Sequence, residues 1–219
     1  MTQEQKKFIE RVGALAAADM QKSGVLASLT IAQAILESGW GKSGLTVKGN
    51  ALFGIKAGTS WTGAVYSGKT QECYDGVTFT TVTGLFRAYG SWAESVADHS
   101  DLLSCNTRYK AVIGERDYKT ACRAIAAAGY ATDPKYADKL VQIIETYALT
   151  AYDGAGSAAK PGGKTLCFPR QAFGLLGLLE RDHEADLDGD HDDGHQHLIL
   201  DNAPAVLHIQ NGHGNDVEV

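Results

Sequence analysis

The spacing of apolar residues changes twice along the first 150 positions of this 219-residue chain, and this change limits the possible folds more than any other feature. Apolar residues recur every three or four positions over 8–36 and again after residue 91, which is helical spacing. Between Asn50 and Tyr89 glycines stand at short intervals with β-forming residues between them, and Asp75-Gly76 is a strong hairpin signal. Helices, a small β lobe and further helices together predict an α+β fold that is mainly helical.

Residues that cap helices mark where the helical segments are expected to begin. Two pairs, Thr2 with Gln5 and Ser91 with Glu94, have the spacing of a capping box. Proline is tolerated in the first turn of a helix, and glycine commonly ends one. The expected caps are Thr2 for a helix over 3–21, Ser28 for a helix through Leu36 that ends at Ser38-Gly39, Ser91 for the segment that carries Trp92, Asp117 for 118–128, and Asp133-Pro134 for the last helix.

The composition divides the chain near residue 164. Residues 154–164 are rich in Gly, Ala and Pro, which is typical of a flexible linker. The part before residue 165 holds 18 Lys and Arg against 15 Asp and Glu, whereas 165–219 holds 2 against 11 and also six of the seven histidines. We therefore expect a domain over 1–153, a linker over 154–164, and an acidic, His-rich appendage over 165–219 with short strand-like pieces.

Glu37 is the leading candidate for a catalytic residue. It lies in the last turn of the second expected helix, where it faces the negative end of the helix dipole, and burial beside Trp40 would further disfavour its charged form. Both effects raise the pKa of a carboxyl group, as a general acid for glycoside cleavage requires. The helix argument taken alone also allows a solvated glutamate at a helix end.

The residues around Glu37 carry a resemblance to a known family. The segments 32–41 (AQAILESGWG) and 50–56 (NALFGIK) are followed by 85–89 (LFRAY) and 129–137 (GYATDPKYA). In order and spacing they resemble glycoside hydrolase family 73, β-N-acetylglucosaminidases that include bacterial autolysins, phage lysins and the flagellar rod-cap hydrolase. The resemblance covers nearly all of 3–150. It implies a lysozyme-like fold, peptidoglycan glycan strands as substrate, and Glu37 as the catalytic acid.

The resemblance also implies a second carboxylate in the β lobe. Glu72, in Thr70-Gln71-Glu72, occupies the place of the family's Thr-x-Glu pattern and is the candidate base. A polar residue on a two-faced strand would look the same. The distance between two such carboxylates distinguishes a mechanism that inverts the anomeric configuration from one that forms a covalent intermediate. A third route uses the substrate's acetamido group as the nucleophile, which would leave Glu72 a supporting role.

Aromatic and polar residues are expected to line a sugar-binding cleft, because sugar rings present apolar faces and hydroxyl edges. The resemblance favours Tyr130, in the Gly-Tyr-Ala-Thr loop, as a residue close to the acid. Tyr136 and Trp92 fall on helix faces and are expected in the core. The candidate substrate-binding residues are Tyr130, Trp40, Asn50, Phe53, Trp61 and Tyr109.

The appendage offers only weak metal-site patterns. The run 186–197 has the wrong residues for an EF-hand at its sixth and twelfth positions, and His195 and His197 share one side of a possible strand. Asp188, Asp190, His195 and His197 could bind a metal, although a solvated acidic segment explains them as well. The four cysteines match no zinc or redox pattern and are expected to be buried thiols.

These observations predict an endo-β-N-acetylglucosaminidase that cleaves peptidoglycan after N-acetylglucosamine. The alternatives are a muramidase or lytic transglycosylase and, in another class, an inactive wall-binding component of a phage tail or secretion apparatus. We expect no cofactor, no nucleic acid partner and no membrane span, and the tail is expected to dock on a larger assembly or to self-associate. The N-terminus lacks the pattern of a secretory signal, so lysis, a virion or an export apparatus is expected to deliver the chain to the cell wall.

Overall fold

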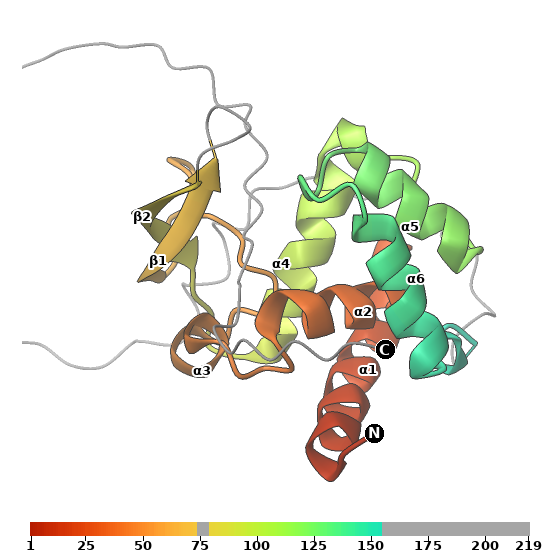
Figure 1. Cartoon of the computed structure of the whole chain (residues 1–219). Coiled ribbons are helices and arrows are strands. Elements are labelled where there is room, and N and C mark those ends of the chain that lie inside the picture. Colours follow the sequence, from red (N-terminus) through yellow and green to blue (C-terminus); the bar gives the residue numbers. More distant parts are fainter. Residues whose placement is uncertain (74–78, 155–219) are drawn as a thin grey trace, which may run out of the picture. The chain divides into compact units, whose positions relative to one another are not determined.

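A computed structural model describes residues 1–73 and 79–154, and the side chains of 70–80 fall outside that description. Within these ranges the fold is mainly helical, with one antiparallel pair of strands, as predicted (Figure 1). The elements in chain order are α1 (Gln3–Ser23), α2 (Ala27–Ser38), α3 (Gly44–Gly49), β1 (Val65–Cys73), β2 (Phe79–Arg87), α4 (Trp92–Cys105), the 3-10 turn η1 (Thr107–Tyr109), α5 (Tyr118–Ala127), α6 (Tyr136–Thr146) and the 3-10 turn η2 (Leu149–Tyr152).

Helix α1 begins with the predicted capping box. The backbone amide of Gln5 donates to Thr2 Oγ1 at 3.2 Å, and the amide of Thr2 donates to Gln5 Oε1 at 2.8 Å. Asp117 caps α5 as expected, because its Oδ2 accepts from the amide of Thr120 at 3.0 Å. These confirmed caps join residues three positions apart.

Helix α2 is not capped by Ser28, so that prediction is wrong. The helix begins at Ala27, two residues before the expected start at Leu29, and its N-cap residue Leu26 offers no side-chain acceptor. The amide of Ser28 instead donates to Asp153 Oδ1 at 2.8 Å, across 125 residues of chain. At the other end, Gly39 takes the left-handed conformation (φ 55°) and ends the helix as predicted.

The start of α6 differs from the prediction, whereas the predicted cap of α4 by Ser91 is confirmed. Helix α6 begins at Tyr136, so Pro134 precedes the helix, and Asp133 Oδ1 accepts from the amide of Lys135 at 2.8 Å in the turn before it. At α4, Ser91 Oγ accepts from the amide of Glu94 at 3.3 Å, but the Glu94 carboxylate receives the amide of Gly90. Local sequence therefore located both helices and missed details of their first turns.

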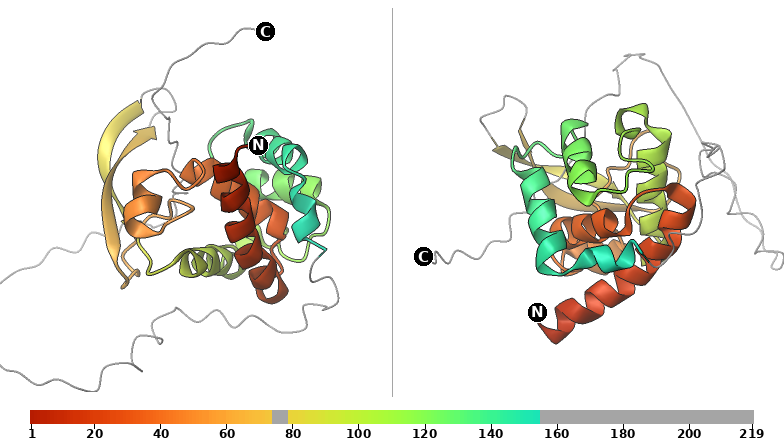
Figure 2. Two further views of the ribbon diagram at one scale, coloured as in Figure 1. Left: turned by 90° about the horizontal axis from the view of Figure 1, so that it is seen from below. Right: turned by 90° about the vertical axis from the view of Figure 1, so that its right-hand side faces the viewer.

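The predicted hairpin is present, with strands β1 and β2 paired from Val65 opposite Arg87 to Cys73 opposite Phe79. Its base packs on α3, because Phe86 is buried with Leu45 and Ala51 in a small cluster of its own. In the left view of Figure 2 the hairpin stands beside α3, on the side away from α5 and α6. The turn signal Asp75-Gly76 lies outside the described residues.

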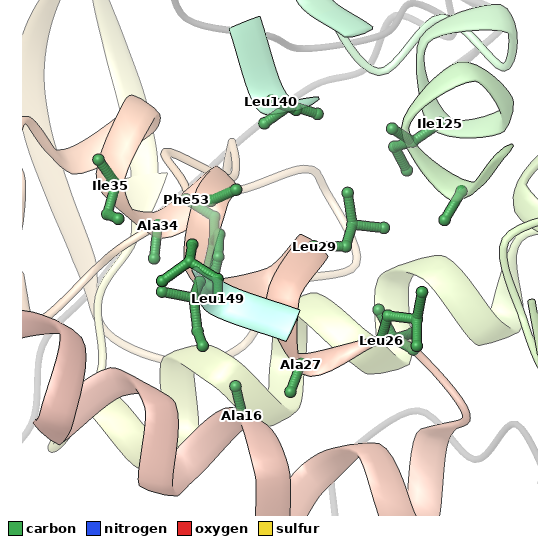
Figure 3. Packing of buried hydrophobic residues seen from close by; sticks show 14 of the residues in the cluster. Ala16, Leu26, Ala27, Leu29, Ala34, Ile35, Phe53, Ile125, Leu140 and Leu149 are labelled. Atoms are coloured by element: carbon green, nitrogen blue, oxygen red, sulfur yellow. The ribbon is translucent and has the colours of Figure 1, made fainter. Parts of the chain in front are cut away.

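The main core surrounds α2 on all sides. Ile31 and Ile35 point into it as expected, but Thr30 and Gln33 on the opposite face are equally buried. Side chains from α1, α4, α5, α6 and η2 close around this helix, and Leu149 of η2 belongs to the same cluster (Figure 3). The helix that carries Glu37 is thus a central helix of the fold, although its sequence predicted only one buried face.

The structure tests two expectations about the whole chain, on the cysteines and on membrane spans, only for the described residues. Cys122 is buried as expected, whereas Cys105 is exposed. In the described part of the chain, no helix is both long and apolar enough to cross a membrane. The domain assignment of 154–164 and 165–219 falls outside the described residues and stays a prediction.

Candidate active site

Glu37 lies in the last turn of α2 with only 6% of its surface exposed. Burial raises the pKa of its carboxyl group from 4.5 to about 7, and a hydrogen bond from Tyr136 opposes this rise. Removal from water penalises the charged carboxylate, which accounts for the direction of the shift. Among the described residues, none forms an ion pair with Glu37 that would keep it charged. Position 37 therefore carries a carboxyl group that can hold a proton near neutral pH.

Tyr136 holds this carboxyl group from the start of α6. Its hydroxyl donates to Glu37 Oε1 at 2.8 Å and accepts from Gln33 Nε2 at 3.1 Å. Gln33 and Glu37 are four residues apart on one face of α2, so a single tyrosine bonds both. Tyr136 is 3% exposed, so its prediction as a core residue is confirmed, and its hydroxyl also contacts the candidate acid. Its sequence distance of 99 residues from Glu37 hid this pairing.

Tyr130 stacks on Tyr136 and brings a second phenol close to Glu37. The two ring centroids are 5.9 Å apart with an interplanar angle of 18°. Burial and the nearby Glu37 carboxylate raise the pKa of both tyrosines, so both phenols are neutral at physiological pH. Tyr109 packs edge-on against Tyr130 at 6.1 Å and is itself 5% exposed. Three tyrosines thus form the wall beside the acid.

His99 extends this wall toward Phe53. Its ring stacks on Phe53 with centroids 4.0 Å apart and meets Tyr130 edge-on at 5.9 Å. Neither imidazole nitrogen has a hydrogen-bond partner among the described residues, and burial lowers the pKa of His99 to about 3. A neutral ring therefore joins the loop of Phe53 to that of Tyr130. The sequence located His99 on a helix but contained no signal for this role.

Asn50 and Trp61 make contacts that hold the loops around the hairpin base. Asn50 adopts φ 50° at the end of α3, and its Nδ2 donates to the carbonyl of Tyr89 at 3.1 Å. The indole Nε1 of Trp61 donates to the carbonyl of Ala64 at 3.0 Å, and the Arg87 guanidinium lies 4.7 Å from the centroid of its ring. Their contact with substrate stays a prediction.

Trp40 packs against the main core. Its ring meets Tyr147 edge-on at 5.0 Å and Phe8 at 5.9 Å. Tyr136 and Tyr130 are among the residues that surround the buried Glu37 carboxyl group. A role for Trp40 in substrate binding stays a prediction.

A partly buried ion pair anchors the hairpin to the helical part of the domain. Arg87 Nη1 at the end of β2 lies 2.9 and 3.0 Å from the two carboxylate oxygens of Asp98 in α4. The hydroxyl of Tyr89 donates to Asp98 Oδ2 at 2.7 Å. Glu72 lies further along the hairpin, in β1 opposite Thr80, and its side chain falls outside the description. Its assignment as the base stays a prediction.

The weak metal candidates of the appendage also lie outside the described residues, namely Asp188, Asp190, His195 and His197. Within 1–73 and 79–154, no group of three or more His, Cys, Asp or Glu side chains could hold a metal ion.

A proton-bearing carboxyl group on a buried central helix, with a small β-hairpin anchored beside it, defines the class: a lysozyme-like glycoside hydrolase domain. The chain belongs to the glucosaminidase family, glycoside hydrolase family 73, because the family model described as mannosyl-glycoprotein endo-beta-N-acetylglucosaminidase matches residues 13–149.

Known proteins agree with this assignment. The chain is 41% identical over 162 residues to the exo-glucosaminidase LytG of Bacillus subtilis, covering 72% of this chain and 56% of that protein. It is 38% identical over 173 residues to a probable N-acetylmuramidase of Lactococcus lactis, covering 75% and 39% respectively. The crystal structure of a peptidoglycan hydrolase from Sphingomonas sp. A1 superposes with a TM-score of 0.57 at 38% identity, covering 72% of this chain and 99% of that one. The chain thus spans about half the length of LytG and less than half the length of the N-acetylmuramidase.

Proposed function

We propose that this chain is an endo-β-N-acetylglucosaminidase that hydrolyses peptidoglycan glycan strands after N-acetylglucosamine, with Glu37 as the general acid. The observation that carries the proposal is the buried carboxyl group of Glu37, whose pKa is raised to about 7. A carboxyl group with a pKa of 4.5 is protonated in roughly one molecule in 300 at pH 7, whereas one with a pKa of 7 is protonated in about half. Burial thus increases the fraction of the acidic form by about two orders of magnitude.

The bond from Tyr136 assigns separate tasks to the two carboxyl oxygens. Tyr136 engages Oε1 at 2.8 Å and is itself oriented by Gln33. The proton is then carried on Oε2 and passes to the bridging oxygen of the glycosidic bond as that bond breaks. The electron pair of the C–O bond stays on the leaving sugar, and the anomeric carbon develops positive charge. Water completes the hydrolysis at this carbon.

We assign Glu72 as the base that activates this water in the second half of the reaction. The family resemblance supports the assignment, together with the location of Glu72 on a hairpin anchored beside the helices. The alternative nucleophile is the acetamido group of the substrate. We also propose that the rings of Tyr130, Tyr109 and Phe53 shape the wall of the sugar site, with Asn50, Trp61 and Trp40 as further candidates.

A muramidase or lytic transglycosylase is the second candidate within enzymes. It is favoured by the 38% identity to a probable N-acetylmuramidase, which equals the identity to other relatives that are peptidoglycan hydrolases. Reducing-end analysis of digested peptidoglycan separates the two. New N-acetylglucosamine ends support the proposal, whereas new N-acetylmuramic acid ends or anhydromuramic products refute it.

The test of catalysis is the full-length variant Glu37→Gln, which cannot donate a proton but retains an oxygen that can accept from Tyr136. We expect its rate of wall hydrolysis to fall by at least about 100-fold, as is typical for the loss of a general acid. Glu10→Gln, on the exposed surface of α1, is the matched control and should hydrolyse at the wild-type rate. Full activity of Glu37→Gln would refute the assignment. Wall binding without hydrolysis by the wild-type protein would instead favour an inactive wall-binding component.

We further propose that the domain acts on the bacterial cell wall, in the periplasm or outside the cell, and that residues 165–219 mount it on a larger assembly such as a phage tail or secretion apparatus. The acidic composition of this segment and its separation by a Gly-rich linker support the proposal. Copurification of partners with the full chain, compared with a variant in which the acidic run 186–193 is made neutral, tests it.

A further inference from the structure

The N-terminus of α2 depends on a distant part of the chain for its cap. The first turn of a helix leaves four amides without intrahelical partners, and neither Leu26 nor any other residue of this terminus offers a side-chain acceptor. Asp153 supplies one, because its Oδ1 accepts from the amide of Ser28 at 2.8 Å. The matched family region ends at residue 149, so Asp153 lies beyond it.

The segment that presents Asp153 is itself firmly held. Leu149 is fully buried in the main core, in the same cluster as Ala16 and Ala27 (Figure 3). The ring of Tyr152 lies so close to Gly13 of α1 that a Cβ at position 13 would overlap it. Ala148 adopts the left-handed conformation (φ 50°), which a non-glycine residue keeps only when its surroundings impose it. The position of Asp153 is therefore set by the fold.

The same stretch of chain, from Tyr136 to Asp153, grips α2 at two points, and we name it the C-terminal clamp. At its beginning Tyr136 bonds Gln33 and Glu37 in the second half of α2, and at its end Asp153 bonds Ser28 in the first turn. Ser28 and Glu37 are nine residues apart, which corresponds to about 13 Å along a helix. Hydrogen bonds near both ends of α2 therefore constrain its axial position and its rotation.

We propose that Asp153 is a positioning residue of the active site, which acts through α2 to keep Glu37 in register with Tyr136. The proposal rests on the assigned role of Glu37 as the acid. Without the Asp153 bond, the amide of Ser28 loses its acceptor, and the first turn of α2 is held only by its buried side chains and by the bond from the Ala27 amide to Met20 Sδ at 3.4 Å. The Glu37–Tyr136 bond then varies in length, and with it the position of the oxygen that carries the proton.

The test compares Asp153→Ala with Asp153→Asn in the full-length protein. Asparagine is as good a helix cap as aspartate because its amide oxygen accepts the same bond, whereas alanine cannot. We expect Asp153→Ala to lower the Tm by about 2–8 °C and the kcat by about fivefold or more at 25 °C, with a smaller change in KM. Asp153→Asn should retain at least half of the wild-type kcat. Exchange of the Ser28 amide with solvent should be at least tenfold faster in the alanine variant alone.

A double-mutant cycle with Tyr136→Phe distinguishes positioning from a merely structural cap. Effects of uncoupled sites more than about 10 Å apart add in free energy, so their rate losses multiply. If Asp153 acts through the Tyr136 contact, Asp153→Ala should lower kcat by less than twofold in the Tyr136→Phe background. Multiplying losses, or a lowered Tm with wild-type kcat, would overturn the proposal.

An NMR titration of the Glu37 side chain keeps this test independent of activity. A pKa of Glu37 that differs between Asp153→Ala and wild type by more than about 0.3 units, and is restored by Asp153→Asn, supports the clamp. An unchanged titration overturns it. A wild-type protein that hydrolyses no peptidoglycan refutes the proposed function, yet the titration still decides whether the clamp positions Glu37.

Discussion

The stability of a Glu37→Gln variant relative to the wild type should increase as the pH rises. The folded-state pKa of Glu37 is raised from 4.5 to about 7, so the folded protein binds this proton more tightly than the unfolded chain does. Stability from this group is fully present below pH 4.5 and is lost as the pH rises toward 7. The loss amounts to about 3 kcal/mol at pH 7, from a shift of roughly 2.5 units at 1.36 kcal/mol each.

Glu37→Gln removes this titration and therefore removes the loss. The glutamine NH2 group adds a cost of about 1–3 kcal/mol if it is left without an acceptor, but that cost does not change with pH. The informative quantity is therefore the difference in Tm between variant and wild type at pH 7.5 minus the same difference at pH 4.5. We expect this quantity to be positive and about 6–12 °C, because 1 kcal/mol corresponds to about 2–4 °C for a domain of this size.

Differential scanning calorimetry of full-length wild type, Glu37→Gln and the exposed control Glu10→Gln at both pH values provides the measurement. The comparison within each pH cancels the titration of every other group, including His99. A Tm difference for Glu37→Gln that stays constant between the two pH values would show that folding does not raise the pKa of Glu37. Burial would then not keep this side chain protonated near neutral pH.

Two further predictions concern the ring wall. His99→Phe should retain the stacking on Phe53 and remove the acid sensitivity that His99 causes. The pKa of His99 is lowered to about 3, so this group costs the wild type stability as the pH falls from 6.5. Urea unfolding should therefore give a free energy of unfolding at pH 7 minus that at pH 4 that is lower in the variant than in the wild type. Tyr136→Phe should lower kcat. It should also raise the pKa of Glu37 that the pH–rate profile reports, because it deletes a hydrogen bond that lowers this pKa. An alkaline limb of the profile that is the same in variant and wild type would contradict this prediction.

The sequence predicted those features whose causes are local. The caps of Thr2 and Asp117 join residues three positions apart, and both are found in the structure. The hairpin was predictable because turn chemistry and strand propensity act on the same few residues. The location of Glu37 at the end of a helix followed from Gly39, whose left-handed conformation ends α2.

Features that depend on long-range contacts could not be predicted in the same way. Ser28 has the side chain of a good cap, yet Asp153 occupies that role from a position 125 residues away. Tyr136 was expected in the core from its helical spacing, and nothing local indicated that its hydroxyl faces Glu37. The raised pKa of Glu37 was predicted in direction, but the tertiary packing around α2 decides which rings exclude water from it.

The ion pair between Arg87 and Asp98 determines which part of the hairpin can diversify. Because Asp98 also accepts from Tyr89, the strand ends are tied to α4 at their base. Changes in sequence or length beyond the Lys69–Thr83 pair leave that attachment intact. Apart from Glu72, the outer half of the hairpin can therefore change in sequence and length without disturbing the surroundings of Glu37.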